Sequence, residues 1–165
     1  MSKEVTRLIV DLSDTAAATR IRAAQQLAQL GEDARGAVVG LVRATADQEE
    51  EVREWAVATL EEVGTPHTAD VDALAELLTS SDSDVGYWSA TLLGRLGPQA
   101  APAVEALTAV VSGAGENVVR QRAVWALGKI GPEAASALES LRLAAGGDDP
   151  RLSRLAQRAI EQIAP

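Results

Sequence analysis

Four aromatic residues are the side chains of this sequence best suited to binding chemistry: Trp55, Tyr87, Trp88 and Trp125 are the only aromatics among its 165 residues. Trp55 and Trp88 are 33 residues apart, and Tyr87 adjoins Trp88. Each such ring offers roughly 150–250 Å² of surface. A group of partly exposed rings is typical of a surface that binds a partner. The other interpretation is that the rings lie across grooves between structural repeats as local packing.

Residues for acid–base, nucleophilic or metal chemistry are sparse. The chain has no cysteine, which excludes disulfides, thiolate metal sites and a cysteine nucleophile. Its single histidine, His67, follows Pro66 in an expected turn. The acidic run Asp47–Glu51 lacks the spacing and the turn glycine of a calcium loop, so we interpret it as charge at a helix start. We therefore expect no catalytic residue, no metal and no cofactor, and a chain that is not an enzyme.

The elements that must position these residues repeat along the chain. A glycine closes a helical pattern every 33 or 34 residues, at Gly31, Gly64, Gly97 and Gly131, and Ala164 holds the next equivalent place. Apolar residues recur 12, 8, 4 and 1 positions before these places, with Thr19 and Ser89 as the exceptions, and this is a helical spacing. Each repeat therefore predicts a helix A, a polar loop and a helix B that ends in a left-handed glycine cap. The predicted A and B helices are 3–12 and 16–30, 34–45 and 50–63, 68–79 and 84–96, 101–111 and 117–130, and 133–145 and 151–163.

The predicted B helices resemble the HEAT-like repeat motif, most clearly over Val52–Gly64 and Val119–Pro132. The third and fifth repeats depart from the motif, with Gly86 and Ser153 where it has an arginine. The short period is similar to that of phycobilisome-lyase HEAT-like proteins. This resemblance implies an all-α fold, a right-handed α-solenoid of five antiparallel helix pairs of the HEAT-like or armadillo-like kind. We expect one domain, 1–165, with repeats at 1–31, 32–64, 65–97, 98–131 and 132–165.

One face of the B helices is the predicted binding site. In HEAT-like proteins this face lines a concave surface, and a helical wheel places all four aromatic residues on it. Trp125 is its weakest member, because the HEAT-like motif itself admits an aromatic residue there. Polar members of the predicted site are Arg22, Glu54, Thr91, Arg122, Arg154 and Arg158.

Charge is distributed unevenly along the chain. The net charge is −9, and the first 82 residues hold 7 basic and 16 acidic residues, against 8 of each in the rest. This acidity argues against DNA or RNA as the partner. Around the four aromatic residues, acidic residues lie toward the N-terminal side and basic ones toward the C-terminal side, an arrangement that would orient an elongated partner or simply keep the helix faces solvated. The face residues in question are Glu51, Glu54, Glu62, Asp84, Arg122, Lys129, Arg151, Arg154 and Arg158.

Another set of arginines is predicted to be structural. Arg20, Arg53 and Arg120 share one repeat position and point toward a neighbouring repeat. We expect them to pair with loop carboxylates.

The function these features favour is a non-catalytic scaffold or adaptor that holds another protein or a peptide in the concave groove. Self-association through the same face stays open. The resemblance implies a second hypothesis, a subunit of an enzyme such as a phycobilin-lyase-like complex, and a third, a HEAT-like DNA-binding or repair protein, which the acidic charge disfavours. No apolar run has membrane length, and the charged Lys3 and Glu4 come soon after Met1, so we expect a soluble cytoplasmic protein without a membrane partner.

Overall fold

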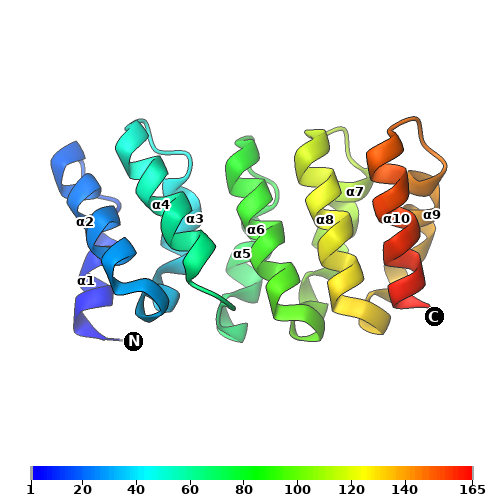
Figure 1. Cartoon of the computed structure of the whole chain (residues 1–165), viewed down its shortest axis with the longest axis horizontal. Coiled ribbons are helices and arrows are strands. Elements are labelled where there is room, and N and C mark those ends of the chain that lie inside the picture. The colour runs from blue at the N-terminus through cyan, green and yellow to red at the C-terminus, as the bar shows by residue number, and fades with distance from the viewer. Residues whose placement is uncertain (1, 165) are drawn as a thin grey trace. The chain divides into compact units, whose positions relative to one another are not determined.

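The computed structural model describes residues 2–164, and this part of the chain folds entirely into helices and their connections (Figure 1). The helices are α1 (Lys3–Asp11), α2 (Ala17–Leu30), α3 (Val38–Ala44), α4 (Glu50–Glu62), α5 (Val71–Leu77), α6 (Ser83–Leu96), α7 (Val104–Ser112), α8 (Asn117–Ile130), α9 (Leu138–Ala145) and α10 (Pro150–Ile163). The even-numbered helices are the predicted B helices, and their ends agree with the prediction to within one residue. The all-α, helix-pair fold class is confirmed.

The helices group into two compact units, residues 1–70 and 71–165. In unit 1, α1 packs on α2, α3 packs on α4, and α2 packs on α4. In unit 2, the pairs are α5 with α6, α7 with α8, and α9 with α10. The B helices of unit 2 lie side by side in the order α6, α8, α10 (Figure 1). That order makes one continuous face of unit 2 from three helices.

The predicted starts of the A helices are wrong in one respect. The segments Gly31–Ala37, Gly97–Ala103 and Gly131–Ala137 form 3-10 turns, and the α-helices begin only after them. The 3-10 form is narrower than an α-helix and stacks positions i and i+3. Alanines stand three and six residues after each of these glycines, and all six are at most 1% exposed. Small side chains at that spacing let the tight turn pack against the helices, which the helical periodicity alone did not indicate.

The repeat glycines have positive φ angles, as the sequence predicts, at Gly31, Gly64, Gly97 and Gly131. The ψ angles are −125° at Gly31, −135° at Gly97 and −143° at Gly131, so these caps are not the left-handed helical type that was predicted. Such a backbone is largely restricted to glycine. The glycine thus reverses the chain between helix B and the next 3-10 turn.

The third repeat breaks the pattern at this turn. In place of the two buried alanines it has His67 and Asp70, and its 3-10 segment is only Thr68–Asp70. The backbone N–H of His67 donates to the Asp70 carboxylate at 3.2 Å. Partial burial raises the pKa of Asp70 above its ordinary value. Unit 2 begins at the next residue, so the division into units coincides with the loss of the alanine pair.

The structural role predicted for the repeat arginines is confirmed for Arg20. Its guanidinium holds the Asp47 carboxylate through two bonds, Nε at 2.7 Å and Nη2 at 2.9 Å, and so joins α2 to the loop before α4. Arg53 instead donates to carbonyl oxygens of the loop before α4, and Arg120 Nε donates to the Val111 carbonyl oxygen in the last turn of α7 at 3.1 Å. The expected carboxylate pairing is therefore wrong for these two, because their guanidinium groups bond to backbone carbonyl oxygens instead.

The repeated apolar positions form the core. Leu41, Leu74, Leu107 and Leu141, ten residues after each glycine, are all 0% exposed. Four polar side chains are buried as well, and Ser89 among them is 0% exposed; the other three are Thr45, Thr59 and Thr91. These packed layers hold the B helices in register and leave their opposite face for other contacts.

Candidate functional site

The predicted site residues divide between the two units. Unit 1 carries Arg22 on α2 and Glu54 and Trp55 on α4. Unit 2 carries the larger group, which is Tyr87, Trp88 and Thr91 on α6, Arg122 and Trp125 on α8, and Arg154 and Arg158 on α10. Trp55 and Trp88 hold the same repeat position but belong to different units.

Tyr87, Arg122 and Trp125 form the central cluster of unit 2. The guanidinium carbon of Arg122 lies 4.4 Å from the centre of the Tyr87 ring and 5.1 Å from that of the Trp125 ring. Arg122 Nη2 also donates a hydrogen bond to the Tyr87 hydroxyl. Stacking on aromatic rings orients a guanidinium and leaves its in-plane N–H groups available for an anion. The sequence predicted these three residues for one site, and in unit 2 they do lie together.

Trp125 also packs into the interface between α6 and α8. A Cβ atom on Gly94 of α6 would overlap the six-membered ring of Trp125. The ring therefore fills the space that the glycine leaves, and the ammonium of Lys129 lies 5.9 Å from the ring centre. The packing interpretation therefore holds for Trp125, while binding of a partner by this ring stays a prediction.

Trp88 is less accessible than the sequence suggests. It is 7% exposed, so the expectation of a partly exposed ring is wrong for this residue. Its ring meets Tyr87 edge-on at 5.6 Å, and the Arg95 guanidinium lies 5.8 Å from its centre. Thr91 is 6% exposed, and its hydroxyl donates to the Tyr87 carbonyl oxygen at 2.8 Å. Trp88 and Thr91 thus support the cluster from within the protein.

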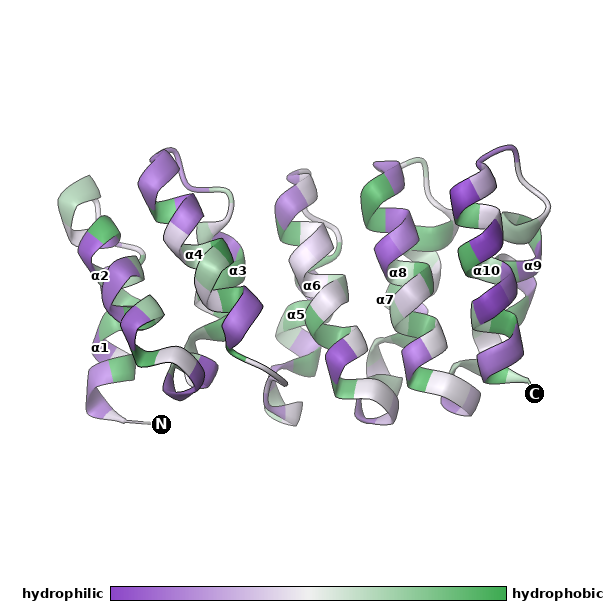
Figure 2. Cartoon of the chain, in the orientation of Figure 1, coloured by the Kyte–Doolittle hydropathy of each residue, from purple (hydrophilic) through white to green (hydrophobic). Residues whose placement is uncertain are grey.

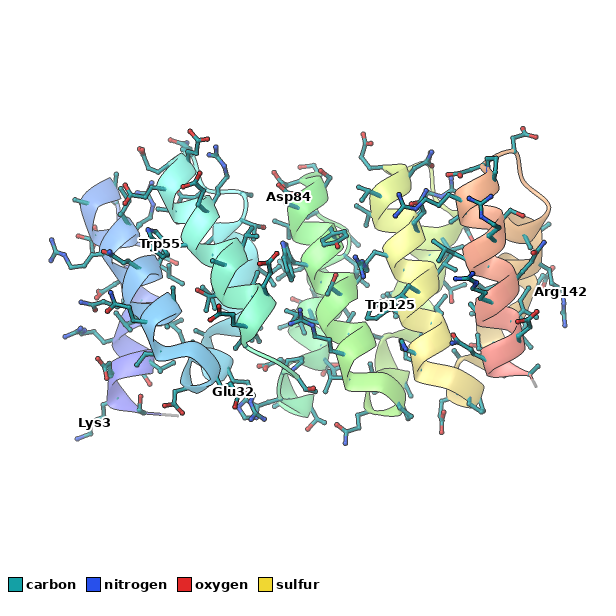
Figure 3. The ribbon with its side chains drawn as sticks, viewed as in Figure 1. Lys3, Glu32, Trp55, Asp84, Trp125 and Arg142 are labelled. Carbon is teal, nitrogen blue, oxygen red and sulfur yellow. The ribbon has the colours of Figure 1, made fainter. Side chains whose placement is uncertain are left out.

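Basic residues are concentrated on one face of unit 2. We define the basic face by its six cations, which are Arg95 on α6, Arg122 and Lys129 on α8, and Arg151, Arg154 and Arg158 on α10. Residues 71–165 contain 8 basic and 11 acidic residues. The positions of α6, α8 and α10 that the helical wheel assigns to this face hold six of the basic residues and a single acidic one, Asp84. The rest of unit 2 therefore carries two basic and ten acidic residues. Figure 2 shows the hydrophilic colouring of α10, and Figure 3 shows Trp125 on α8. These two features locate the basic face.

Sequence reasoning missed Arg95 as a site residue. The sequence could have indicated it, because Arg95 stands two residues before the repeat glycine Gly97, as Lys129 does before Gly131.

Most cations of the basic face have no carboxylate partner. Within residues 2–164, no salt bridge involves Arg122, Lys129, Arg151, Arg154 or Arg158. The carboxylate of Asp149, next to this face, already accepts from the backbone N–H groups of Arg151 and Leu152 and from the Gln121 amide. Those bonds, led by the Leu152 N–H, lower the pKa of Asp149. Asp149 thus keeps its negative charge beside the face, but the five cations named above form no salt bridge within residues 2–164, so the face carries a net positive charge.

The predicted residues of unit 1 do not form a comparable cluster. Arg22 is exposed and borders a hollow of about 270 Å³ with Arg7 and Asp11, which lie 3.7 Å apart. Glu54 is exposed, and Trp55 is half-buried on the side of α4 toward α2 (Figure 3).

The described residues offer little support for other chemistry. Among residues 2–164, no group of three or more metal-ligating side chains is arranged to hold an ion. Over the same residues, no helix combines the length and apolar character that crossing a membrane requires. The clustered cations of the basic face are able to attract anionic groups.

Comparison with solved structures finds the same fold in designed and natural proteins. An engineered protein is 25% identical, with a TM-score of 0.63, over 98% of this chain, which spans only 48% of that protein. A designed armadillo repeat protein in complex with the peptide (KR)4 is 18% identical, with a TM-score of 0.66, over 96% of this chain and 81% of its own. One chain of the complex of CpcE and CpcF of phycocyanin lyase from Nostoc sp. PCC7120 is 23% identical, with a TM-score of 0.64, over 97% of this chain and 65% of its own length. The likeness to the last two shows the fold alone.

Comparison of sequences gives the family. No curated protein matches the chain. The family of HEAT repeats matches it over residues 5–85 and again over residues 71–161, and together these stretches cover four B helices in full and most of α10. Both matches agree with the helix pairs, glycine caps and buried leucines described above. The chain belongs to the HEAT-repeat family.

Proposed function

We propose that this chain is a non-catalytic scaffold that binds another protein through the basic face of unit 2. The observation that carries the proposal is the Tyr87–Arg122–Trp125 cluster at the centre of that face. Arginine and the large aromatics are the residues that most often contribute binding energy at protein interfaces. A stacked, hydrogen-bonded arginine also loses little side-chain entropy when a partner binds.

The fold likeness adds support of a general kind. The designed armadillo neighbour was solved with a peptide bound, and the lyase neighbour is a complex of two proteins. Proteins with this helix-pair fold can therefore present a surface to a peptide or to a second protein. For this chain, the absence of cysteine and the single histidine keep the proposal non-catalytic.

Affinity capture from a lysate of the source organism tests the proposal. The informative variant is Tyr87→Ala/Arg122→Ala, because a change at the buried Trp88 would also disturb packing. The matched control is Arg142→Ala, an exposed cation of α9 outside the basic face (Figure 3). We expect wild type and control to capture a common partner that the double variant loses. Capture of the same proteins by all three chains would refute the proposal.

Two narrower expectations need separate measurements. Cell fractionation of the source organism tests the cytoplasmic location. Light scattering across a concentration series tests whether the partner is a second copy of this chain.

A further inference from the structure

The basic face has a charge pattern that selects among protein partners. Six cations occupy this face with one carboxylate, while the rest of unit 2 has two cations and ten carboxylates. Charges placed for solubility alone are expected to be mixed over the surface. The segregation therefore points to a ligand with the opposite sign.

Helix α10 carries this pattern at a cost to its own stability. Arg151, Arg154 and Arg158 stand at helical spacings of three and four, where like charges repel. Arg151 is also in the first turn of α10, where the helix dipole disfavours a cation. All three side chains are exposed. An arrangement that weakens the isolated helix is understandable if a bound anionic partner offsets the repulsion.

The rings of the face fit an acidic peptide better than a nucleic acid. Binding of single strands relies on aromatic faces on which bases stack. Here Tyr87 and Trp125 contact Arg122, and Trp125 also contacts Gly94 and Lys129. In addition, residues 1–70 hold 7 basic and 13 acidic residues, and the chain as a whole has a charge of −9, which repels a continuous polyanion.

We propose that the basic face binds an extended acidic segment of another protein, with the carboxylates of that segment pairing with Arg122, Arg154, Arg158 and their neighbouring cations. This inference rests on the proposed function and specifies its partner. Guanidinium groups pair with carboxylates through two parallel hydrogen bonds. A segment of about eight extended residues reaches about 26–29 Å, enough to cross three helices packed about 8–10 Å apart.

The test is fluorescence anisotropy with labelled peptides and the full chain. The acidic probe is (Glu-Asp)4, the basic probe is (Lys-Arg)4, and oligo-dT of equal length represents nucleic acid. We expect the acidic probe alone to bind. Its affinity is expected to fall steeply between about 0.1 M and 1 M salt, as the Debye length shortens from about 10 Å to 3 Å.

Variants assign the binding to the basic face. Each single change among Arg122→Gln, Arg154→Gln and Arg158→Gln is expected to weaken binding of the acidic probe about two- to five-fold, and the triple change about 10-fold or more. Arg142→Gln, outside the face, should leave it unchanged. Circular dichroism verifies that the variants stay folded.

Several outcomes would overturn the inference. These are no binding of the acidic probe at low salt, equal binding of the basic probe, tighter binding of oligo-dT, or an equal loss in Arg142→Gln. Self-association that the triple change abolishes would instead identify a second copy as the occupant. If lysate capture still depends on Tyr87 and Arg122 while the acidic probe fails, only the acidic partner is refuted and the scaffold proposal stands.

Discussion

Ser89 occupies a position that is alanine in the four other repeats. It is fully buried, and its hydroxyl oxygen has no hydrogen-bond partner among the described residues. An unsatisfied buried polar group costs about 1–3 kcal/mol, and alanine also favours a helix more than serine does. We predict that Ser89→Ala raises the free energy of unfolding by about 1–2 kcal/mol, measured by urea denaturation.

A second serine provides the matched control. The Ser153 hydroxyl donates to the Ala145 carbonyl oxygen at 2.6 Å, so Ser153→Ala should lower the free energy of unfolding by about 1 kcal/mol. An unchanged or lower stability of Ser89→Ala would mean that the hydroxyl has a partner in solution.

At the residue scale, the sequence predicted which residues share the site better than it predicted how deeply each of them is buried. The wheel placed Tyr87, Arg122 and Trp125 on one face, and the structure brings them together. The helical wheel did not indicate that Trp88 is only 7% exposed. Burial depends on how closely neighbouring helices approach, and periodicity within one helix does not contain that distance. The sequence feature that makes room for the Trp125 ring is Gly94, a glycine within a helix. Its role is visible only when α8 is packed against α6.

At the scale of elements, the α6–α8 interface depends on the complementarity of Gly94 and Trp125. We predict that Gly94→Ala destabilises the protein by about 1–3 kcal/mol, because its methyl group would overlap the ring. In a Trp125→Ala background the same change should be neutral or stabilising, since alanine is the better helix former. A double-mutant cycle of urea unfolding energies measures this coupling. Additive effects of the two substitutions would show that the ring does not occupy this space in solution.

The α2–α4 connection in unit 1 is predicted to be sensitive to acid. The hydrogen bonds from Arg20 hold the pKa of Asp47 below its ordinary value of 3.8. A carboxyl whose pKa is lower in the folded state stabilises the fold above its unfolded pKa, and this contribution is lost as the pH falls through the folded pKa. Asp47→Asn should therefore lower unfolding stability at pH 7, and the difference from wild type should shrink below about pH 3.8.

Asp14→Asn is the control for this acid dependence. The Asp14 carboxylate accepts from the Ala16 backbone N–H at 2.7 Å, and no salt bridge of residues 2–164 involves it. Urea unfolding of both variants at neutral and acid pH makes the comparison. An Asp47→Asn difference that is the same at all pH values would contradict a role for the Arg20–Asp47 ion pair.

The elements themselves were largely predictable. Five repetitions of one apolar pattern fixed the B helices to within a residue, because each repeat confirms the others. The 3-10 turns were not predicted, since their signal is the small alanines such as Ala34 and Ala37 and not a change in hydrophobic period. The break in the third repeat was not predicted either, although His67 and Asp70 stand there at the positions of the two alanines.

At the scale of the whole molecule, each of the two units has its own buried leucines. Leu41 in unit 1 and Leu107 in unit 2 hold the same repeat position, and both are 0% exposed. In a repeat protein each repeat mainly contacts its neighbours, so a local loss of packing weakens nearby helices most. Either substitution to alanine should cost about 2–5 kcal/mol. The two variants should nevertheless destabilise different parts of the chain.

Hydrogen exchange of the backbone amides measures that difference. We predict that Leu41→Ala speeds exchange in α2, α3 and α4 more than in α8 and α10, and that Leu107→Ala has the reverse effect. Equal acceleration along the entire chain in both variants would mean that the molecule opens as one cooperative body. The distinction matters for binding, because the basic face lies wholly within unit 2. If unit 2 keeps its protection in Leu41→Ala, that variant should also retain the anionic-ligand affinity of the wild type, and Leu107→Ala should lose it.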